Sequence, residues 1–194
     1  AIESVNKEVK SKAGRTRLEY LEFVTPADMQ RIKAMEIIPS IRPEVTLTDK
    51  LILNETIKPE NGQNLGLWSN LLKQNNIIIS GTDFPYHTIN PLVVMYYLSS
   101  GLSVDTAANR LTNNIAQKLS VLDALKSFTV YSAFASFAEE VKGTLEKDKF
   151  ADMVVLSDDI LASDPAVLLK AKILMTIIRG EVVYENKSPG ALLY

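Results

Sequence analysis

Apolar and polar positions alternate along the first part of the chain in a way that predicts an α/β body. Residues 15–23 alternate charged and apolar side chains at period two, and residues 37–41 form a second apolar run, so both segments are predicted strands. Between them, Thr25 is a predicted N-cap, with Pro26 at the first helical position and Asp28 at the third. This pattern predicts a helix that ends near Met35.

The centre of the chain continues the same alternation of strands and helices. A long region rich in Asn, Pro, Glu and Thr, residues 44–66, predicts an irregular loop, and residues 68–74 predict a helix. The apolar run 76–79 then predicts a buried strand that ends in Ser80-Gly81-Thr82 and leads to Asp83. Helical spacing follows from Pro91, with a break near Gly101 and a capping box that begins at Ser120. The helix after this box is expected to cover Leu125 to Glu139 in two pieces.

The last part of the chain has a different character. Residues 153–156, 174–178 and 182–184 predict strands, and Arg179-Gly180 is a predicted turn between the last two. We therefore expect two domains, an α/β body over residues 1–142 and a β module over residues 143–194. The first residues carry apolar positions 2, 5 and 9 at helical spacing without an initiator Met, so we expect further sequence upstream.

Composition narrows the classes of protein that this chain can be. With 194 residues, 46% of them hydrophobic, it can bury a substantial core. A net charge of −2 without long like-charge blocks argues against nucleic acid or an anionic membrane as the main partner. The absence of cysteine excludes disulfides, thiolate metal sites and cysteine nucleophiles within the chain. We find no signal peptide or membrane-spanning stretch and expect a soluble protein, with the cytoplasm preferred over secretion.

Asp83 is the leading candidate for chemistry. It follows a predicted buried strand, and active sites of parallel α/β folds gather where such strands end. The alternative role is a helix cap or turn residue, which is a common use of Asp after a strand. His87, the single histidine, is either a contact to substrate or metal or a surface imidazole. Arg42 could bind an acidic group of a substrate or form an ion pair with a nearby Glu.

These residues and their surroundings resemble a known family. The segments Arg17-Leu18-Glu19-Tyr20, Ile41-Arg42-Pro43 and Gly81-Thr82-Asp83-Phe84-Pro85, together with the run from Leu119 to Ser157 and Gly180 to Glu185, resemble the C-terminal portion of metal-dependent amidohydrolases of amidohydrolase family 3. The resemblance covers nearly the whole chain. It implies the last strands, six to eight, of a (β/α)₈ barrel of the metallo-dependent hydrolase type, followed by part of a small β-sandwich. A complete barrel takes about 250 residues, so we expect a fragment.

The resemblance also implies a metal and roles for named residues. It implies a divalent metal, preferably zinc, whose other ligands lie on strands outside this chain. Asp83 matches the aspartate of the eighth strand, which contacts the metal-bound water and accepts its proton, and we assign Asp83 both as the catalytic residue and as the residue of this chain at the metal. Tyr20 stands where the family has a histidine ligand, which leaves the second metal position open. We assign Tyr20, Arg42 and His87 to substrate binding.

The expected function of the parent is hydrolysis of a C–N bond in a small, non-peptide amide by a metal-activated water, with Asp83 as general base. Taken alone, the chain is expected to lack activity. The alternatives are a non-catalytic binding or regulatory protein with a degenerate amidohydrolase site, and a stand-alone interaction domain. Unpaired strand edges at the barrel and sandwich also predict a possible homo-oligomer.

Overall fold

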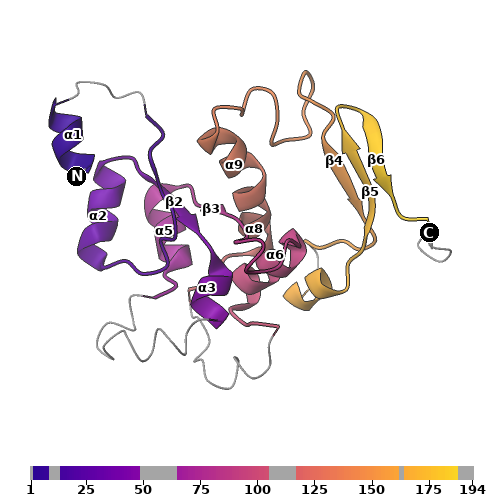
Figure 1. Cartoon of the computed structure of the whole chain (residues 1–194), viewed down its shortest axis with the longest axis horizontal. Helices are drawn as coiled ribbons and strands as arrows, with labels where there is room; N and C mark the ends of the chain where they lie inside the picture. Colours follow the sequence, from indigo (N-terminus) through magenta and orange to yellow (C-terminus); the bar gives the residue numbers. More distant parts are fainter. Residues whose placement is uncertain (1, 9–13, 49–64, 105–116, 162–163, 188–194) are drawn as a thin grey trace.

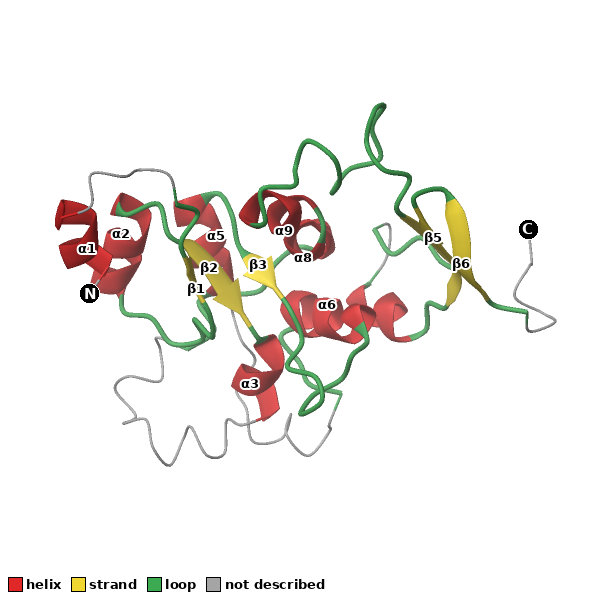
Figure 2. Ribbon diagram, turned by 45° about the horizontal axis from the view of Figure 1, so that its top comes forward, coloured by secondary structure: helices red, strands yellow, loops and turns green. Residues whose placement is uncertain are grey.

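The computed structural model describes residues 2–8, 14–48, 65–104, 117–161 and 164–187, and two three-stranded sheets organise them. The first sheet is parallel, with strands in the order β1 (Arg17–Leu18), β2 (Ile38–Ile41) and β3 (Ile79–Ser80). The second is antiparallel, in the order β4 (Met153–Leu156), β5 (Ile173–Ile178) and β6 (Glu181–Glu185). Figures 1 and 2 show the second sheet at the end of the molecule opposite α1 and α2.

Helices connect the parallel strands and cover them. Their bounds are α1 (Ile2–Glu8), α2 (Pro26–Ala34), α3 (Pro43–Thr48), α5 (Trp68–Asn75), α6 (Pro91–Ser100), α8 (Val121–Phe128) and α9 (Val130–Ala135), with a short 3₁₀-helix η2 (Pro165–Leu169). Helices α8 and α9 contact β3, and α5 contacts β2. The polypeptide therefore forms an α/β layer around the parallel sheet, as the sequence pattern predicts.

Local sequence signals account for where two of these helices begin. The Thr25 hydroxyl accepts a hydrogen bond from the backbone N–H of Asp28 at 3.2 Å, and Pro26 occupies the first position of α2. The Ser120 hydroxyl accepts from the backbone N–H of Asp123 at 3.0 Å, which caps α8. Such caps satisfy backbone donors that have no partner inside the helix.

The larger buried cluster of the described residues lies between the parallel sheet and its helices, and a smaller one contains Ile38, Ile79 and Ala135. Large side chains with less than 2% of their surface exposed fill the larger cluster, among them Trp68 and Leu71 of α5, Ile41 of β2 and Leu98 of α6. The second sheet is different, because Val154, Val182, Val183 and Tyr184 each keep about half of their surface exposed. Burial of apolar surface thus stabilises the sheet that carries the candidate site far more than it stabilises the second sheet.

The structure differs from the predicted elements in four places, one of which is β3, which comprises Ile79–Ser80 and not 76–79. The first strand comprises Arg17–Leu18 and not all of 15–23, because Tyr20 has a positive φ of 56° that turns the chain out of the extended conformation. Residues 43–48 form α3, although the sequence predicted that 44–66 is irregular; residues 49–64 lie outside the described part. The second piece of the helix predicted to reach residue 139 ends at Ala135.

Candidate active site at the carboxyl ends of the parallel strands

The candidate residues gather at one edge of the parallel sheet. Glu19 and Tyr20 follow β1, Arg42 follows β2, and Asp83 lies three residues beyond β3. Because the three strands are parallel, their carboxyl ends meet at the same edge, where ligand sites of α/β folds form. The fold therefore brings together residues that are far apart in the sequence.

A direct hydrogen bond joins Tyr20 to Asp83. The Tyr20 hydroxyl donates to Oδ1 of Asp83 at 2.7 Å, and the two residues are 63 positions apart. This bond raises the pKa of Tyr20 above its ordinary value of 10.0, because loss of the phenolic proton would set two negative charges side by side. Tyr20 is therefore a neutral hydrogen-bond donor at physiological pH.

Arg42 lies beside this pair and makes several polar contacts. Its Nη2 pairs with Oε2 of Glu19 at 2.9 Å, and its Nη1 donates to the Ser40 hydroxyl at 3.0 Å and the Ile41 carbonyl at 2.9 Å. The guanidinium carbon stands 5.6 Å from the centre of the Tyr20 ring, within cation–π range. The ion pair with a Glu, one of the two roles considered from the sequence, is thus present.

Glu19 joins the same network from the end of β1. Its burial opposes ionisation, but hydrogen bonds from Ser40 and Arg17 and the positive charge of Arg42 together lower the pKa of the Glu19 carboxyl. Glu19 therefore stays ionised and supplies the charge that holds Arg42. Sequence reasoning assigned no role to Glu19 or Ser40, since the contact between them joins different strands.

His87 lies on the turn that Asp83 begins. The backbone N–H groups of Tyr86 and His87 donate to the Asp83 carbonyl at 2.8 and 3.2 Å. Glu44, in the first turn of α3, is 4% exposed, and its burial raises the pKa of its carboxyl against the opposing effects of the His87 charge and a backbone hydrogen bond from Thr88. His87 and Glu44 are thus electrostatic neighbours near Asp83, and sequence reasoning missed Glu44 because it placed this segment in a loop.

The described part of the chain does not form a metal centre by itself. No group of three or more His, Cys, Asp or Glu side chains suited to a metal ion occurs among the residues that the structure describes. Of the candidate residues, Asp83 has the oxygen ligand that divalent metals accept, whereas the proton of Tyr20 is engaged in the bond to Asp83. A metal at this edge would need its other ligands from outside the described residues.

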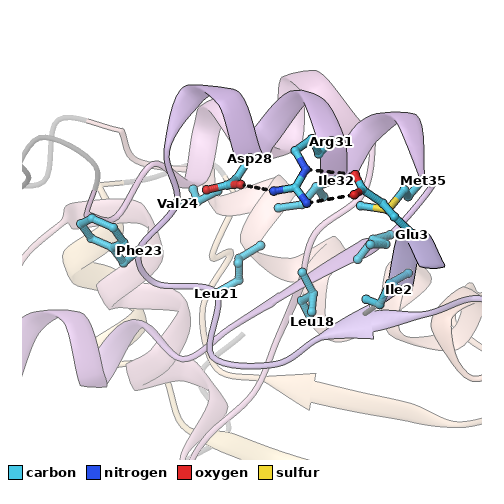
Figure 3. A pocket seen from close by; sticks show the side chains of 11 residues that line it. Ile2, Glu3, Leu18, Leu21, Phe23, Val24, Asp28, Arg31, Ile32 and Met35 are labelled. Carbon is cyan, nitrogen blue, oxygen red and sulfur yellow. Dashed lines mark hydrogen bonds and ion pairs between the residues drawn. The ribbon is translucent and has the colours of Figure 1, made fainter. Parts of the chain in front are cut away.

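Two cavities elsewhere in the molecule contain none of the predicted site residues. One, of about 320 Å³, lies between α1, the β1 segment and α2, where Arg31 bridges Glu3 and Asp28 across its rim (Figure 3). The other, of about 670 Å³, lies between α8, α9 and the segment around β4.

In the described part, no helix has the length and apolarity needed to cross a membrane.

Comparison with known proteins places this architecture in a class. The solved structures that resemble it include a metal-dependent hydrolase from Pyrococcus horikoshii, with a TM-score of 0.66 and 24% identity over 78% of this chain and 30% of that one. Aspergillus niger ochratoxinase has a TM-score of 0.62 at 18% identity, covering 91% of this chain and 39% of that one. Escherichia coli guanine deaminase also has a TM-score of 0.62, at 17% identity over 90% and 40% of the two chains. These similarities establish that the fold is shared with such hydrolases.

Sequence comparison then identifies the family. The chain belongs to the amidohydrolase family, whose model matches residues 1–184, which confirms the resemblance drawn from the sequence. YtcJ of Bacillus subtilis, named as an amidohydrolase, is 24% identical over 95% of this chain and 35% of its own length. Protein LONG AFTER FAR-RED 3 of Arabidopsis thaliana is 27% identical over 88% of this chain and 29% of its own. The chain thus spans about a third of the length of the curated relatives that it matches.

Proposed function

We propose that the whole protein is a metal-dependent hydrolase that cleaves C–N bonds of small, non-peptide amides. In this proposal, β1, β2 and β3 are the last three strands of a (β/α)₈ barrel, and β4, β5 and β6 belong to a flanking β-sandwich. Membership of the amidohydrolase family supports the general class of reaction. The single observation that carries the proposal is the half-buried Asp83 carboxylate at the sheet edge, held by a hydrogen bond from Tyr20 at 2.7 Å.

The residues of this chain would act mainly by handling a proton. A bound divalent metal, preferably zinc, would supply an acidified water. Asp83 would accept the proton of that water as the water oxygen attacks the carbonyl carbon of the substrate. It would then pass the proton to the amide nitrogen of the substrate as the C–N bond breaks. The hydrogen bond from Tyr20 to Oδ1 would fix the orientation of the carboxylate, so that its other oxygen faces the water. His87, on the turn after Asp83, would contact the substrate.

The number of metal ligands in this chain supports a further part of the proposal, namely that the chain is inactive when separated from the rest of the protein. The described residues contain no three-ligand cluster for a metal, so the chain supplies Asp83 while other strands supply the remaining ligands. A carboxylate without its metal cannot generate hydroxide at neutral pH. Metal-dependent turnover by this chain alone would contradict this part.

One observation favours a second candidate function. Tyr20 occupies a position where a histidine ligand is expected, and its hydroxyl is bound to Asp83. This arrangement also suits a binding or regulatory protein that retains an amidohydrolase fold with a degenerate metal site. The two candidates differ in whether the purified protein holds a metal.

The first experiment is to measure metal stoichiometry by mass spectrometry on the whole protein, purified without chelator and supplied with zinc. One or two equivalents, followed by turnover on a panel of N-acyl amino acids and cyclic amides, would support the hydrolase. Asp83→Asn should then lower kcat by about 10²- to 10⁴-fold. The matched control is Asp148→Asn at an exposed position outside the site, which should leave turnover unchanged. A protein without metal would favour the binding role, and full activity of Asp83→Asn would exclude Asp83 as the base.

A further inference from the structure

The Arg42 side chain lies beside the Tyr20 ring and beside the segment that leads to Asp83. Toward β1, its guanidinium pairs with Glu19 at 2.9 Å and lies 5.6 Å from the centre of the Tyr20 ring. The ring that donates to Asp83 is therefore packed beside a fixed positive charge. A cation beside an aromatic ring is attracted to it, and that attraction restrains where the ring lies.

Toward β3, the same guanidinium packs against Gly81, two residues before Asp83. A Cβ atom built on Gly81 would lie 3.3 Å from Cζ of Arg42 and 3.4 Å from its Nη1, so the glycine leaves just enough room for the guanidinium. The Gly81 backbone N–H donates to the Ile41 carbonyl at 3.3 Å, next to Arg42 in the sequence. The segment that delivers Asp83 is thus in contact with Arg42.

Arg42 is itself firmly held. Its side chain is 19% exposed, and Nη1 donates to both Ser40 and the Ile41 carbonyl while Nη2 binds Glu19. Its backbone N–H is bound by the carboxylate of Glu22, which is 6% exposed. A guanidinium is a rigid fork that can make these contacts at once, which the single ammonium of a lysine cannot do.

We propose that Arg42 is a positioning residue, which sets the distance between the Tyr20 hydroxyl and the Asp83 carboxylate by contacting Tyr20 on one side and Gly81 on the other. This role replaces direct substrate binding by Arg42, because three of its five N–H donors already serve Glu19, Ser40 and the Ile41 carbonyl. The effect of Arg42 on catalysis rests on the proposed function. The structural effect, which is loss of the Tyr20–Asp83 hydrogen bond when residue 42 is shorter or uncharged, does not depend on that function.

The test compares Arg42→Met and Arg42→Lys with Arg17→Met in the whole protein. Arg17 is the matched control, because it also pairs with Glu19 at 2.9 Å, while the guanidinium beside Tyr20 and Gly81 belongs to Arg42. The structural readout is the ¹³Cζ NMR signal of Tyr20, assigned with Tyr20→Phe. In Arg42→Met this signal should move to its position in Asp83→Ala, which has no side-chain acceptor for the Tyr20 hydroxyl. Arg17→Met should leave it in place.

The kinetic readout separates positioning from substrate contact. Arg42→Met should lower kcat by about 10- to 100-fold with KM and metal content nearly unchanged, and Arg42→Lys should recover only part of the loss. A raised KM at unchanged kcat would show that Arg42 binds substrate and would overturn the proposal. A wild-type NMR signal in both Arg42 variants would overturn it as well. If the wild-type protein has no turnover, the proposed function fails, and the NMR comparison still decides the role of Arg42. If Arg42→Met does not fold, the NMR signal of Arg42→Lys is used in its place.

Discussion

A methyl group added at Gly143 should destabilise the protein through two separate effects. Gly143 has a φ of +99°, a conformation that residues with a side chain rarely adopt. A Cβ at this position would also lie 2.7 Å from the Cβ of Ala133 in α9 and 3.3 Å from the Thr129 carbonyl oxygen. Gly143 is the first residue of the predicted second domain, so Gly143→Ala perturbs the junction between α9 and the segment that leads to β4.

Gly180→Ala provides a measure of the first effect alone. Gly180 has a φ of +84°, and nothing lies within 4 Å of a Cβ added there. Backbone strain of this kind costs about 1–3 kcal/mol, so Gly180→Ala should lose about that much stability. Gly143→Ala carries the same strain plus overpacking against Ala133, which costs about another 1–3 kcal/mol. The expected total for Gly143→Ala is therefore about 2–6 kcal/mol.

Equilibrium unfolding in urea, followed by the fluorescence of Trp68, measures both variants. Trp68 is the single tryptophan and is 0% exposed, so its emission reports loss of the core around the parallel sheet. The free energy of unfolding should fall more for Gly143→Ala than for Gly180→Ala at an unchanged m-value. Adding Ala133→Gly to Gly143→Ala should remove the close contact and recover part of the lost stability. The glycine inside α9 itself costs about 1 kcal/mol, so the recovery is incomplete. Equal losses in the two single variants would refute the steric reasoning, and with it the close packing of residue 143 on α9.

Three further predictions concern the core, the surface charge and the metal. Leu98→Ala, at a position with 0% exposure, should lower the free energy of unfolding by about 2–5 kcal/mol in urea, whereas Leu122→Ala, 46% exposed, should change it far less. Arg15 lowers the pKa of Glu139 from 4.5 to about 2, so this pair stabilises the fold above pH 4.5 and the contribution disappears as the pH falls toward 2. Glu139→Gln should therefore lower Tm at pH 6 and have no effect near pH 2; the same change at both pH values would contradict this. Chelation of the whole protein should abolish turnover and added zinc should restore it, whereas activity that survives complete metal removal would contradict the hydrolase proposal.

Much of the fold could be predicted because its signals are local. The capping patterns at Thr25 and Ser120 gave the starts of α2 and α8, and runs rich in apolar and β-branched residues gave β4, β5 and β6 to within a residue. Helix α3 was missed because its six residues, which begin with Pro43, include few apolar positions and open a polar stretch. The length of β1 was overestimated because the left-handed turn at Tyr20 leaves no mark on the alternation of polar and apolar residues.

Three members of the candidate site, Tyr20, Arg42 and Asp83, could be named from the sequence, but their contacts could not. Tyr20, Arg42 and Asp83 each follow a strand, and the parallel pairing of those strands decides which side chains meet. Tyr20 and Asp83 are 63 residues apart, and the spacing of polar and apolar residues does not indicate a contact over that distance in the sequence. The buried Glu44 and the ion pair of Arg15 with Glu139 were equally out of reach, because each depends on segments distant in the chain.

The Tyr20–Asp83 contact changes how the missing histidine is interpreted. A phenol can replace imidazole at a metal only by losing its proton, and the adjacent Asp83 carboxylate makes that loss harder by raising the pKa of Tyr20. The same carboxylate benefits from the retained proton, because the hydrogen bond restrains it at the edge where a water would be activated. In the proposed hydrolase, Tyr20 would therefore be better suited to hold Asp83 than to replace a metal ligand. Under that proposal, a tyrosine at this position would change the number of metal ions bound before it would change whether Asp83 accepts a proton.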